Sequence, residues 1–318
     1  MNSTKTIFIV SAGHSGSTIL DLLLGTVPGI FSTGELAHLP FLFERDPVDE
    51  ACSCGSRFSE CEFWKQVTEK IDYPINVNIL RAKHISHFNR MDHLKRHLWL
   101  RPARAVAEMG IRTGPEKGIA KMTSKALGLA GPAKNLARLY QAIGEVSGSQ
   151  FVVDSSKDII RAGSYASCQP ESARVIVLIR DLRAVVYANY RRGWEHEEIV
   201  RHWKAGYGRI IKVLKHWPSA KPTLMTYADF TNNPQLTRQK YSESLGLTCP
   251  SDESLNIQTD SYHLIAGNPL RFEGKLEIRP NQIWREKLPR ELQDKYVDLN
   301  EQVFDTLRRH STELFIDQ

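Results

Sequence analysis

Near the start of the chain, six consecutive residues have the composition of a loop that binds an anion. Glycines allow the backbone to curl so that successive N–H groups point inward, and hydroxyl side chains add further donors. An apolar run, Lys5 to Val10, precedes the loop, and a helical pattern from Ser17 to Gly25 follows it. A helix N-terminus adds positive potential there. An ordinary tight turn is the alternative, but the pattern favours a phosphate-binding loop, made of Gly13, His14, Ser15, Gly16, Ser17 and Thr18.

The loop differs from the Walker A loop of enzymes that use ATP or GTP. When the two are aligned on Gly16, Ser17 takes the place of the Walker lysine and Ser11 that of the first glycine. The ammonium group that reaches the β- and γ-phosphates would therefore be missing. The loop suits a less charged phosphate, although a nucleotide or sugar kinase with a degenerate loop remains an alternative function.

Further apolar segments predict the sheet that must position this loop. Gln150 to Val153, Arg174 to Ile179 and Pro222 to Thr226 read as strands, and Leu182 to Tyr190 reads as a helix. Strands that alternate with helices are typical of a parallel sheet. We therefore expect an α/β fold, with a P-loop-like, doubly wound parallel sheet flanked by helices. It would form one domain, residues 1–318.

A helical insertion at about 75–145 is expected between the first two strands. From Arg81 to Lys134 it carries twelve Lys and Arg residues against three acidic ones, in a chain of net charge +6. It would be a lid over an acidic acceptor, a peripheral contact with a membrane, or a solvated helical face. Aromatic residues are not interleaved regularly with the basic ones, which argues against nucleic acid. A non-catalytic protein that binds an anion or nucleic acid is a further alternative function.

The composition is that of a globular protein, with 41% hydrophobic and 25% charged residues. No apolar run approaches the roughly 18 residues that span a bilayer, and no cleavage site follows the first apolar run, so a cytoplasmic location is expected. Cys52, Cys54 and Cys61 match a four-ligand zinc site poorly. Glu60 or a distant histidine would have to complete such a site. We therefore expect reduced thiols and no metal.

Taken in order along the chain, these motifs resemble those of the PAPS-dependent sulfotransferases of bacterial and carbohydrate type. In that family the loop reads Lys or Arg-Ser-Gly-Thr/Ser-Thr, so this chain departs from it at His14. The resemblance covers most of the chain outside the basic segment. Its further motifs are Gly34-Glu35, Cys52-x-Cys54-Gly55 with Cys61-x-Phe63-Trp64, Val153-Asp154-Ser155-Ser156-Lys157, Val177 to Val185, Tyr227-Ala228-Asp229-Phe230 with Pro234, Leu245-Gly246-Leu247 and Gly267-Asn268-Pro269-x-Arg271-Phe272.

The resemblance implies transfer of a sulfuryl group from 3′-phosphoadenosine-5′-phosphosulfate (PAPS) to a hydroxyl or amine, with release of PAP and no metal requirement. The acceptor would be a carbohydrate or another small molecule. The loop would hold the phosphosulfate and Arg180 the 3′-phosphate, with Arg271 as a second phosphate contact. A family serine eight positions after the arginine is Ala188 here, which puts that contact in doubt and makes Asn189 its candidate substitute.

Sulfuryl transfer needs a base for the acceptor proton and a donor that stabilises the departing oxygen. Glu35 is the first candidate for the base, since carbohydrate-type members have a glutamate in this region; a carboxylate at a helix start is the alternative interpretation. His263 is a rival base. His14 and Lys157 are candidates for the stabilising role, and a bound phosphosulfate would draw His14 toward its charged form.

Overall fold

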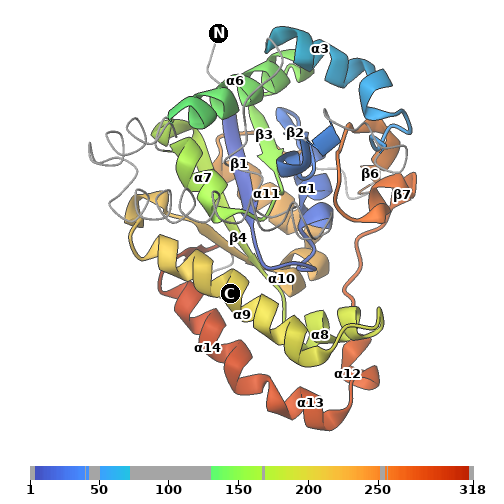
Figure 1. The fold of residues 1–318 in the computed structure, drawn as a ribbon, viewed down its shortest axis with the longest axis vertical. Coiled ribbons are helices and arrows are strands. Elements are labelled where there is room, and N and C mark those ends of the chain that lie inside the picture. The colour runs from blue at the N-terminus through green and yellow to red at the C-terminus, as the bar shows by residue number, and fades with distance from the viewer. Residues whose placement is uncertain are drawn as a thin grey trace, which may run out of the picture.

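The computed structural model describes residues 4–39, 41–42, 51–71, 130–166, 169–250, 255 and 257–314. Its centre is a sheet of six strands in the order β2-β3-β1-β4-β5-β8 (Figure 1). Every neighbouring pair in this sheet is parallel, which confirms the predicted fold class. The strands are β1 (Lys5–Val10), β2 (Ile30–Ser32), β3 (Phe151–Asp154), β4 (Ala173–Ile179), β5 (Thr223–Thr226) and β8 (Thr312–Glu313).

Helices cover both faces of the sheet, so the central strands are apolar on both sides. Alternate side chains of β1 enter two different clusters, with Phe8 and Val10 on one face and Ile7 and Ile9 on the other. The helices are α1 (Ser17–Gly25), α3 (Glu62–Lys70), α6 (Ala130–Ser147), α7 (Ile159–Ala166), α8 (Leu182–Tyr190), α9 (His196–Leu214), α10 (Tyr227–Asn232), α11 (Pro234–Ser244), α12 (Trp284–Lys287), α13 (Arg290–Lys295) and α14 (Val297–Arg308).

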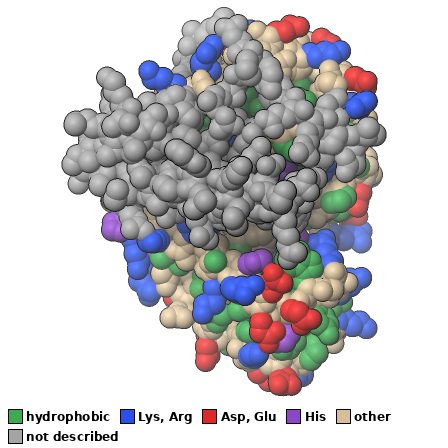
Figure 2. Space-filling model, in the orientation of Figure 1, with side chains coloured by type: hydrophobic (Ala, Val, Ile, Leu, Met, Phe, Trp, Pro, Cys, Tyr) green, Lys and Arg blue, Asp and Glu red, His purple; other side chains and the backbone are tan. Residues whose placement is uncertain are grey.

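Most of the predicted helical insertion at 75–145 lies outside the described residues. Its last part forms nearly all of α6, whose side chains Leu136, Tyr140 and Ile143 are fully buried in the core. This helix therefore belongs to the body of the domain. Around α9, α13 and α14, acidic and basic side chains are intermixed on the surface (Figure 2).

A small antiparallel sheet, β6 (Ile257–Gln258) and β7 (Lys275–Leu276), brackets the segment that returns to the main sheet. Within that segment, Ile265 forms a parallel bridge with Gly34, just beyond β2. No helix in the described part of the chain is long and apolar enough to cross a membrane.

The chain order of the strands creates a switch point at β1, which lies between β3 and β4. α1, which follows β1, packs on one face of the sheet, whereas α7 and α8, which follow β3 and β4, pack on the other. Ligands of open α/β sheets bind at the carboxyl ends of the strands where the connections diverge in this way. The loops after β1, β3 and β4 meet there.

Candidate active site

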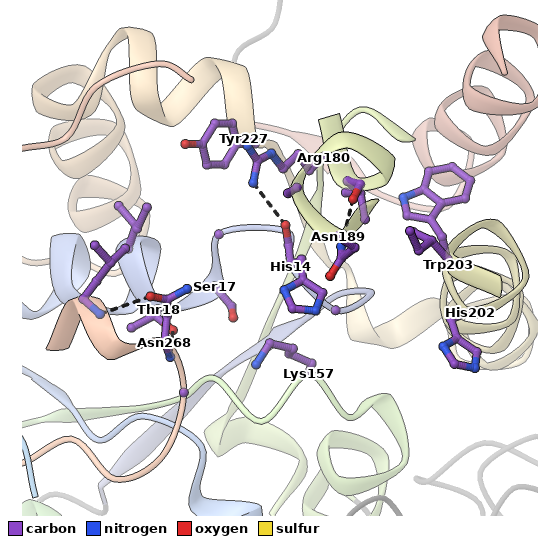
Figure 3. A pocket seen from close by; sticks show the side chains of 18 of the residues that line it. His14, Ser17, Thr18, Lys157, Arg180, Asn189, His202, Trp203, Tyr227 and Asn268 are labelled. Atoms are coloured by element: carbon purple, nitrogen blue, oxygen red, sulfur yellow. Dashed lines mark hydrogen bonds between the residues drawn. The ribbon is translucent and has the colours of Figure 1, made fainter. Parts of the chain in front are cut away.

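At this edge of the sheet lies a cavity of about 740 Å³ (Figure 3). It is lined by segments that are far apart in the sequence: the loop after β1, the residues after β3 and β4, the end of α8, the start of α9 and the loop after Ile265. The predicted site residues among its lining are Gly13, His14, Gly16, Ser17, Thr18, Glu35, Lys157, Arg180 and Asn189.

The loop after β1 turns into α1 at Gly16, which has φ +91°. A Cβ there would lie 2.6 Å from the ring of Tyr227, so the close approach of that ring requires glycine. The amides of Ile19 and Leu20 donate to the Gly16 carbonyl. The earlier N–H groups of the helix have no acceptor within it and are available to an anion.

The three hydroxyls of the loop do not all face the cavity. Ser17 and Thr18 line it, and Thr18 Oγ1 also accepts a hydrogen bond of 3.2 Å from the amide of Asn268. Ser15 is fully buried, with Oγ 3.1 Å from the Tyr207 hydroxyl. Since that hydroxyl donates to the Leu178 carbonyl, the Ser15 hydroxyl donates to Tyr207, and its side chain stabilises the loop from beneath.

Arg180 follows β4 and faces the same cavity as the loop (Figure 3). One guanidinium nitrogen donates to the His14 carbonyl at 3.2 Å, and the group stacks on the Tyr227 ring with its carbon 4.1 Å from the ring centre. Its Nε is buried and has no hydrogen-bond partner among the described residues. The guanidinium is therefore held in place while it keeps donors for a further acceptor.

His14 is held by Arg192, whose guanidinium lies 3.0 Å from Nδ1. Arginine can only donate, so Nδ1 must accept and the ring proton must be on Nε2. Burial lowers the pKa of His14 to about 4, and the neighbouring charges of Arg192, Lys157 and Arg180 contribute to the shift. At pH 7 His14 is therefore a neutral N–H donor.

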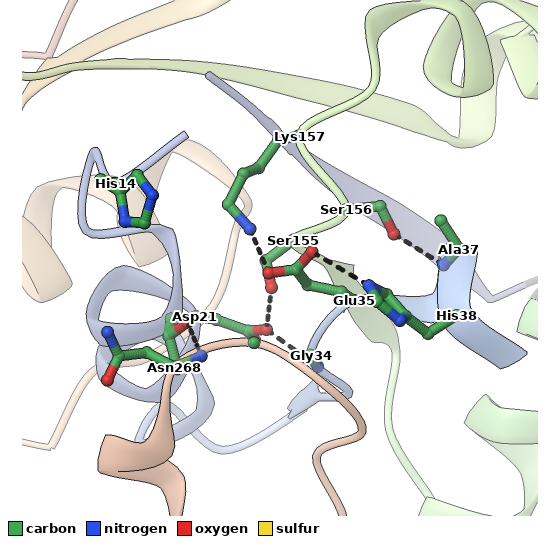
Figure 4. Close-up of polar contacts among 12 residues, drawn as sticks. His14, Asp21, Gly34, Glu35, Ala37, His38, Ser155, Ser156, Lys157 and Asn268 are labelled. Carbon is green, nitrogen blue, oxygen red and sulfur yellow. Dashed lines mark hydrogen bonds and ion pairs between the residues drawn. The ribbon is translucent and has the colours of Figure 1, made fainter. Parts of the chain in front are cut away.

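Glu35 lies between Lys157 and His38 (Figure 4). Lys157 donates from Nζ to Glu35 Oε1, and His38 Nε2 lies 3.7 Å from the other carboxylate oxygen. Burial lowers the pKa of His38, so this imidazole is neutral at pH 7. The side chains of Lys157 and Glu35 are only 15% and 14% exposed, so the pair is shielded from water.

The backbone is strained at the two candidates for the stabilising role. His14 has φ 61° and Lys157 has φ 63°, in the left-handed region that disfavours residues with a Cβ. Each such residue costs of order 1–3 kcal/mol, and such strain is concentrated at functional sites. The two meet at this cavity from the ends of neighbouring strands.

Like Ser15, two further predicted residues lie outside the cavity. Arg271 is buried, does not line the cavity and donates to the Gly267 carbonyl at 3.1 Å, so it shapes the loop next to Thr18. His263 lies among the cysteines, with its ring nitrogen 3.3 Å from Cys61 Sγ. Asn189 does line the cavity beside Ala188, but its amide nitrogen donates to the Val185 carbonyl within α8.

Several residues that line the cavity were not predicted from the sequence. Arg192 and Trp194 follow the end of α8. Two arginines precede Gly193-Trp194 in the sequence, and this cationic turn soon after Arg180 could have indicated a further contact with an anion. Tyr227 belongs to a motif of the resemblance but was given no role in the site. His202 and Trp203 gave no signal, because helical spacing explains them equally well. They complete the side of the cavity beyond Arg180.

A buried carboxyl group beneath the site was also missed. Asp21 of α1 accepts hydrogen bonds from the Gly34 amide at 3.0 Å and the Ser155 hydroxyl at 2.8 Å (Figure 4). Burial raises its pKa to about 7. It connects the segments that carry Glu35 and Lys157. An acidic residue within the apolar run of the predicted helix could have indicated this buried carboxyl group.

No protein-family model matches the chain, and no curated protein matches its sequence. Among solved structures, it is similar to a sulfotransferase domain from the curacin biosynthetic pathway, with 15% identity and a TM-score of 0.49 over 97% of this chain and 99% of that one. It is also similar to a sulfotransferase domain from the Synechococcus PCC 7002 olefin synthase, with 16% identity and a TM-score of 0.46 over 95% of each chain. Likeness this distant does not decide the activity.

Proposed function

We propose that the protein is a sulfotransferase that moves the sulfuryl group of PAPS to a hydroxyl or amine of a carbohydrate or another small molecule. The observation that carries the proposal is the meeting of two anion-binding elements in one cavity. The N-terminus of α1 with Ser17 and Thr18 faces the same space as the Arg180 guanidinium. A donor with a phosphosulfate at one end and a phosphate at the other has charges that suit both elements.

The lining argues against a kinase. Glu35 is the single carboxylate among the described lining residues, and it is paired with Lys157. Kinases hold Mg²⁺ with at least one free carboxylate beside the phosphates, and their phosphate loop carries the lysine that Ser17 replaces here. A sulfuryl donor that carries no triphosphate does not require Mg²⁺.

Glu35 is the proposed base. It takes the acceptor proton as the acceptor oxygen or nitrogen bonds to sulfur and the bond from sulfur to the bridging phosphate oxygen breaks. The electron pair leaves with PAP. The phosphates compete with Glu35 for the Lys157 ammonium, so binding of the donor frees the carboxylate to accept a proton. This exchange couples activation of the base to occupancy of the donor site.

His14 and Lys157 stabilise the charge that develops on the departing oxygen. The Nε2–H of neutral His14 donates a hydrogen bond, and the N–H groups at the start of α1 supply further donors whose positions are fixed beforehand. Sulfotransferases of this family carry a lysine or arginine where this chain has His14. Arg192, which donates to the His14 imidazole, partly replaces that positive charge.

The acceptor is proposed to bind on the side of the cavity that α8 and α9 line. This side combines apolar and aromatic surface with one imidazole: Val185, Trp194, Ile199, His202 and Trp203. Trp203 Nε1 is buried and has no hydrogen-bond partner among the described residues. Aromatic faces with a few polar donors suit a sugar or a comparably flat small molecule.

The test is a binding comparison followed by a transfer assay. Thermal stabilisation of the full chain is measured with PAP, ADP, ATP with magnesium, and a short oligonucleotide. The proposal expects stabilisation by PAP above all others, and PAPS-dependent sulfated products in a mass-spectrometric screen of hydroxyl and amine acceptors. Preference for ATP with magnesium would instead support the kinase, and preference for the oligonucleotide the nucleic-acid binder.

A further inference from the structure

Three cysteines and one histidine converge on the outer side of the segment that carries Ile265. The Sγ atoms of Cys52, Cys54 and Cys61 and the Nδ1 atom of His263 all lie within 4.8 Å of one another. The cysteines belong to a turn and the start of α3, whereas His263 comes from the segment between β6 and β7. The fold therefore brings together four soft ligand atoms from distant parts of the chain.

We propose that Cys52, Cys54, Cys61 and His263 bind one structural zinc ion. In a tetrahedral site with Zn–S near 2.3 Å and Zn–N near 2.0–2.1 Å, neighbouring sulfurs are roughly 3.8 Å apart and sulfur and nitrogen roughly 3.5 Å. The Cys61 sulfur lies 3.7 Å from that of Cys52 and 3.8 Å from that of Cys54. His263 Nδ1 lies 3.3 Å from the Cys61 sulfur and 3.7 Å from the Cys52 sulfur.

The surroundings of the cluster are those of a closed metal site. Cys52 and Cys61 are buried, and their sulfurs accept hydrogen bonds from the amides of Cys54 and Trp64. Such N–H···S contacts stabilise thiolates and are typical surroundings of metal ligands. Gly55, with φ +87°, forms the turn that brings Cys54 back toward Cys52. Burial of thiolates is costly unless a cation compensates for it.

The histidine is held in a fixed orientation. The Phe63 ring stacks on the imidazole with centres 4.8 Å apart and planes 3° from parallel. Trp64 Nε1 donates to the His263 carbonyl at 3.1 Å. Both aromatic residues come from α3, immediately after Cys61. One short stretch of sequence thus supplies a ligand and the two groups that orient the fourth ligand.

The cluster is connected to the wall of the cavity but does not line it. Ser53 donates from its amide to the Leu264 carbonyl and from its hydroxyl to the Tyr262 carbonyl, so the cysteine turn is bonded on both sides of His263. The carbonyl of Ile265, the residue after Leu264, accepts a hydrogen bond of 2.9 Å from the Glu35 amide. A zinc ion here would fasten the cysteine turn to the segment that positions Glu35, with a structural role.

The test is the metal content of the full chain, purified without added zinc. We expect about one zinc ion per chain in the wild type, and a loss of at least roughly tenfold in Cys54→Ser and His263→Ala. Cys249→Ser is the matched control, because Cys249 lies outside the cluster, and it should keep its zinc. Cobalt in place of zinc should give the intense visible bands of a tetrahedral thiolate site.

A second measurement does not depend on the folding of the variants. Modification of the wild-type thiols should release zinc to a colorimetric chelator in proportion to the protein. Wild-type protein that lacks zinc and gives no cobalt–thiolate bands would overturn the proposal, as would zinc that persists in both ligand variants. None of these readouts involves PAP, so their failure would leave the proposed sulfotransferase activity standing.

Discussion

Replacement of Arg180 by lysine keeps a positive charge at the carboxyl end of β4 but removes the planar guanidinium. Lysine cannot form a two-pronged contact with a phosphate, and it does not stack on an aromatic face as a guanidinium does. In the structure, Arg180 stacks on Tyr227 at 4.1 Å and keeps Nε without a partner among the described residues. The substitution should therefore weaken binding of PAP through geometry, with net charge unchanged.

The magnitude follows from the contacts that are lost. One charge-assisted hydrogen bond contributes about 1.5–3 kcal/mol, and stacking of a cation on an aromatic ring about 0.5–1 kcal/mol. Their loss together weakens binding by about 2–4 kcal/mol, which corresponds to a roughly 30- to 1,000-fold higher Kd for PAP.

The assay is isothermal titration with PAP and with AMP, which lacks the 3′-phosphate. If Arg180 binds that phosphate, Arg180→Lys should weaken binding of PAP by this factor and change binding of AMP only slightly. Arg183→Lys is the matched control: Arg183 pairs with Asp181 at 2.7 Å and does not line the cavity. It should leave both affinities unchanged.

Equal weakening for both nucleotides would refute the assignment. It would mean that Arg180 acts by holding the His14 carbonyl, and therefore the loop, instead of by contact with the 3′-phosphate. Unchanged binding of PAP would remove Arg180 from the donor site altogether.

Three further predictions concern the carboxylates and His14. Glu35→Gln should lower kcat by about 10²- to 10⁴-fold. It should also lower the Kd of PAP, because the phosphates no longer compete with a carboxylate for Lys157. Glu62→Gln on the exposed face of α3 should change neither value, and weaker PAP binding by the same factor as the loss of kcat would contradict the role of Glu35 as base. The pKa of His14 is about 4 in the free protein, and bound phosphates should raise it. Binding of PAP then takes up a proton, so the Kd of PAP should fall more steeply toward acid pH in the wild type than in His14→Gln. Parallel pH profiles of the Kd in the two proteins would exclude this role of His14. The pKa of Asp21 is raised from 3.8 to about 7, so between these pH values the folded state holds a proton that the unfolded state releases. The free energy of unfolding should therefore fall as pH rises from about 4 to about 7. Urea titrations should find a smaller fall in Asp21→Asn.

The sequence predicted the central strands because their side chains are apolar on both faces. It also predicted α1, which follows β1, and α8, which follows β4. Lys5–Val10 and Ser17–Gly25 were predicted with the bounds that the structure has, and β4 begins one residue earlier than expected. β2 and β8 were missed. They contain three and two residues, too few for a periodic pattern, and they exist because the sheet offers an edge to pair with.

The loop and Arg180 were predicted as parts of one site, and the structure brings them to one cavity. What the sequence did not reveal is the direction in which side chains turn. Ser15 faces Tyr207 and Arg271 faces its own loop, because tertiary packing supplies partners that spacing does not encode. The contact of His263 with Cys61 spans 202 positions, so the sequence could not show which distant histidine lies beside the cysteines.

The left-handed backbones of His14 and Lys157 carry a consequence for the evolution of the protein. Glycine at either position would relieve the strain, so mutation and selection for robustness alone would remove these side chains. Under the proposed function, the imidazole and the ammonium offset this loss of stability through their roles in turnover. Variants that acquire glycine at either position should therefore resist heat better and lose activity.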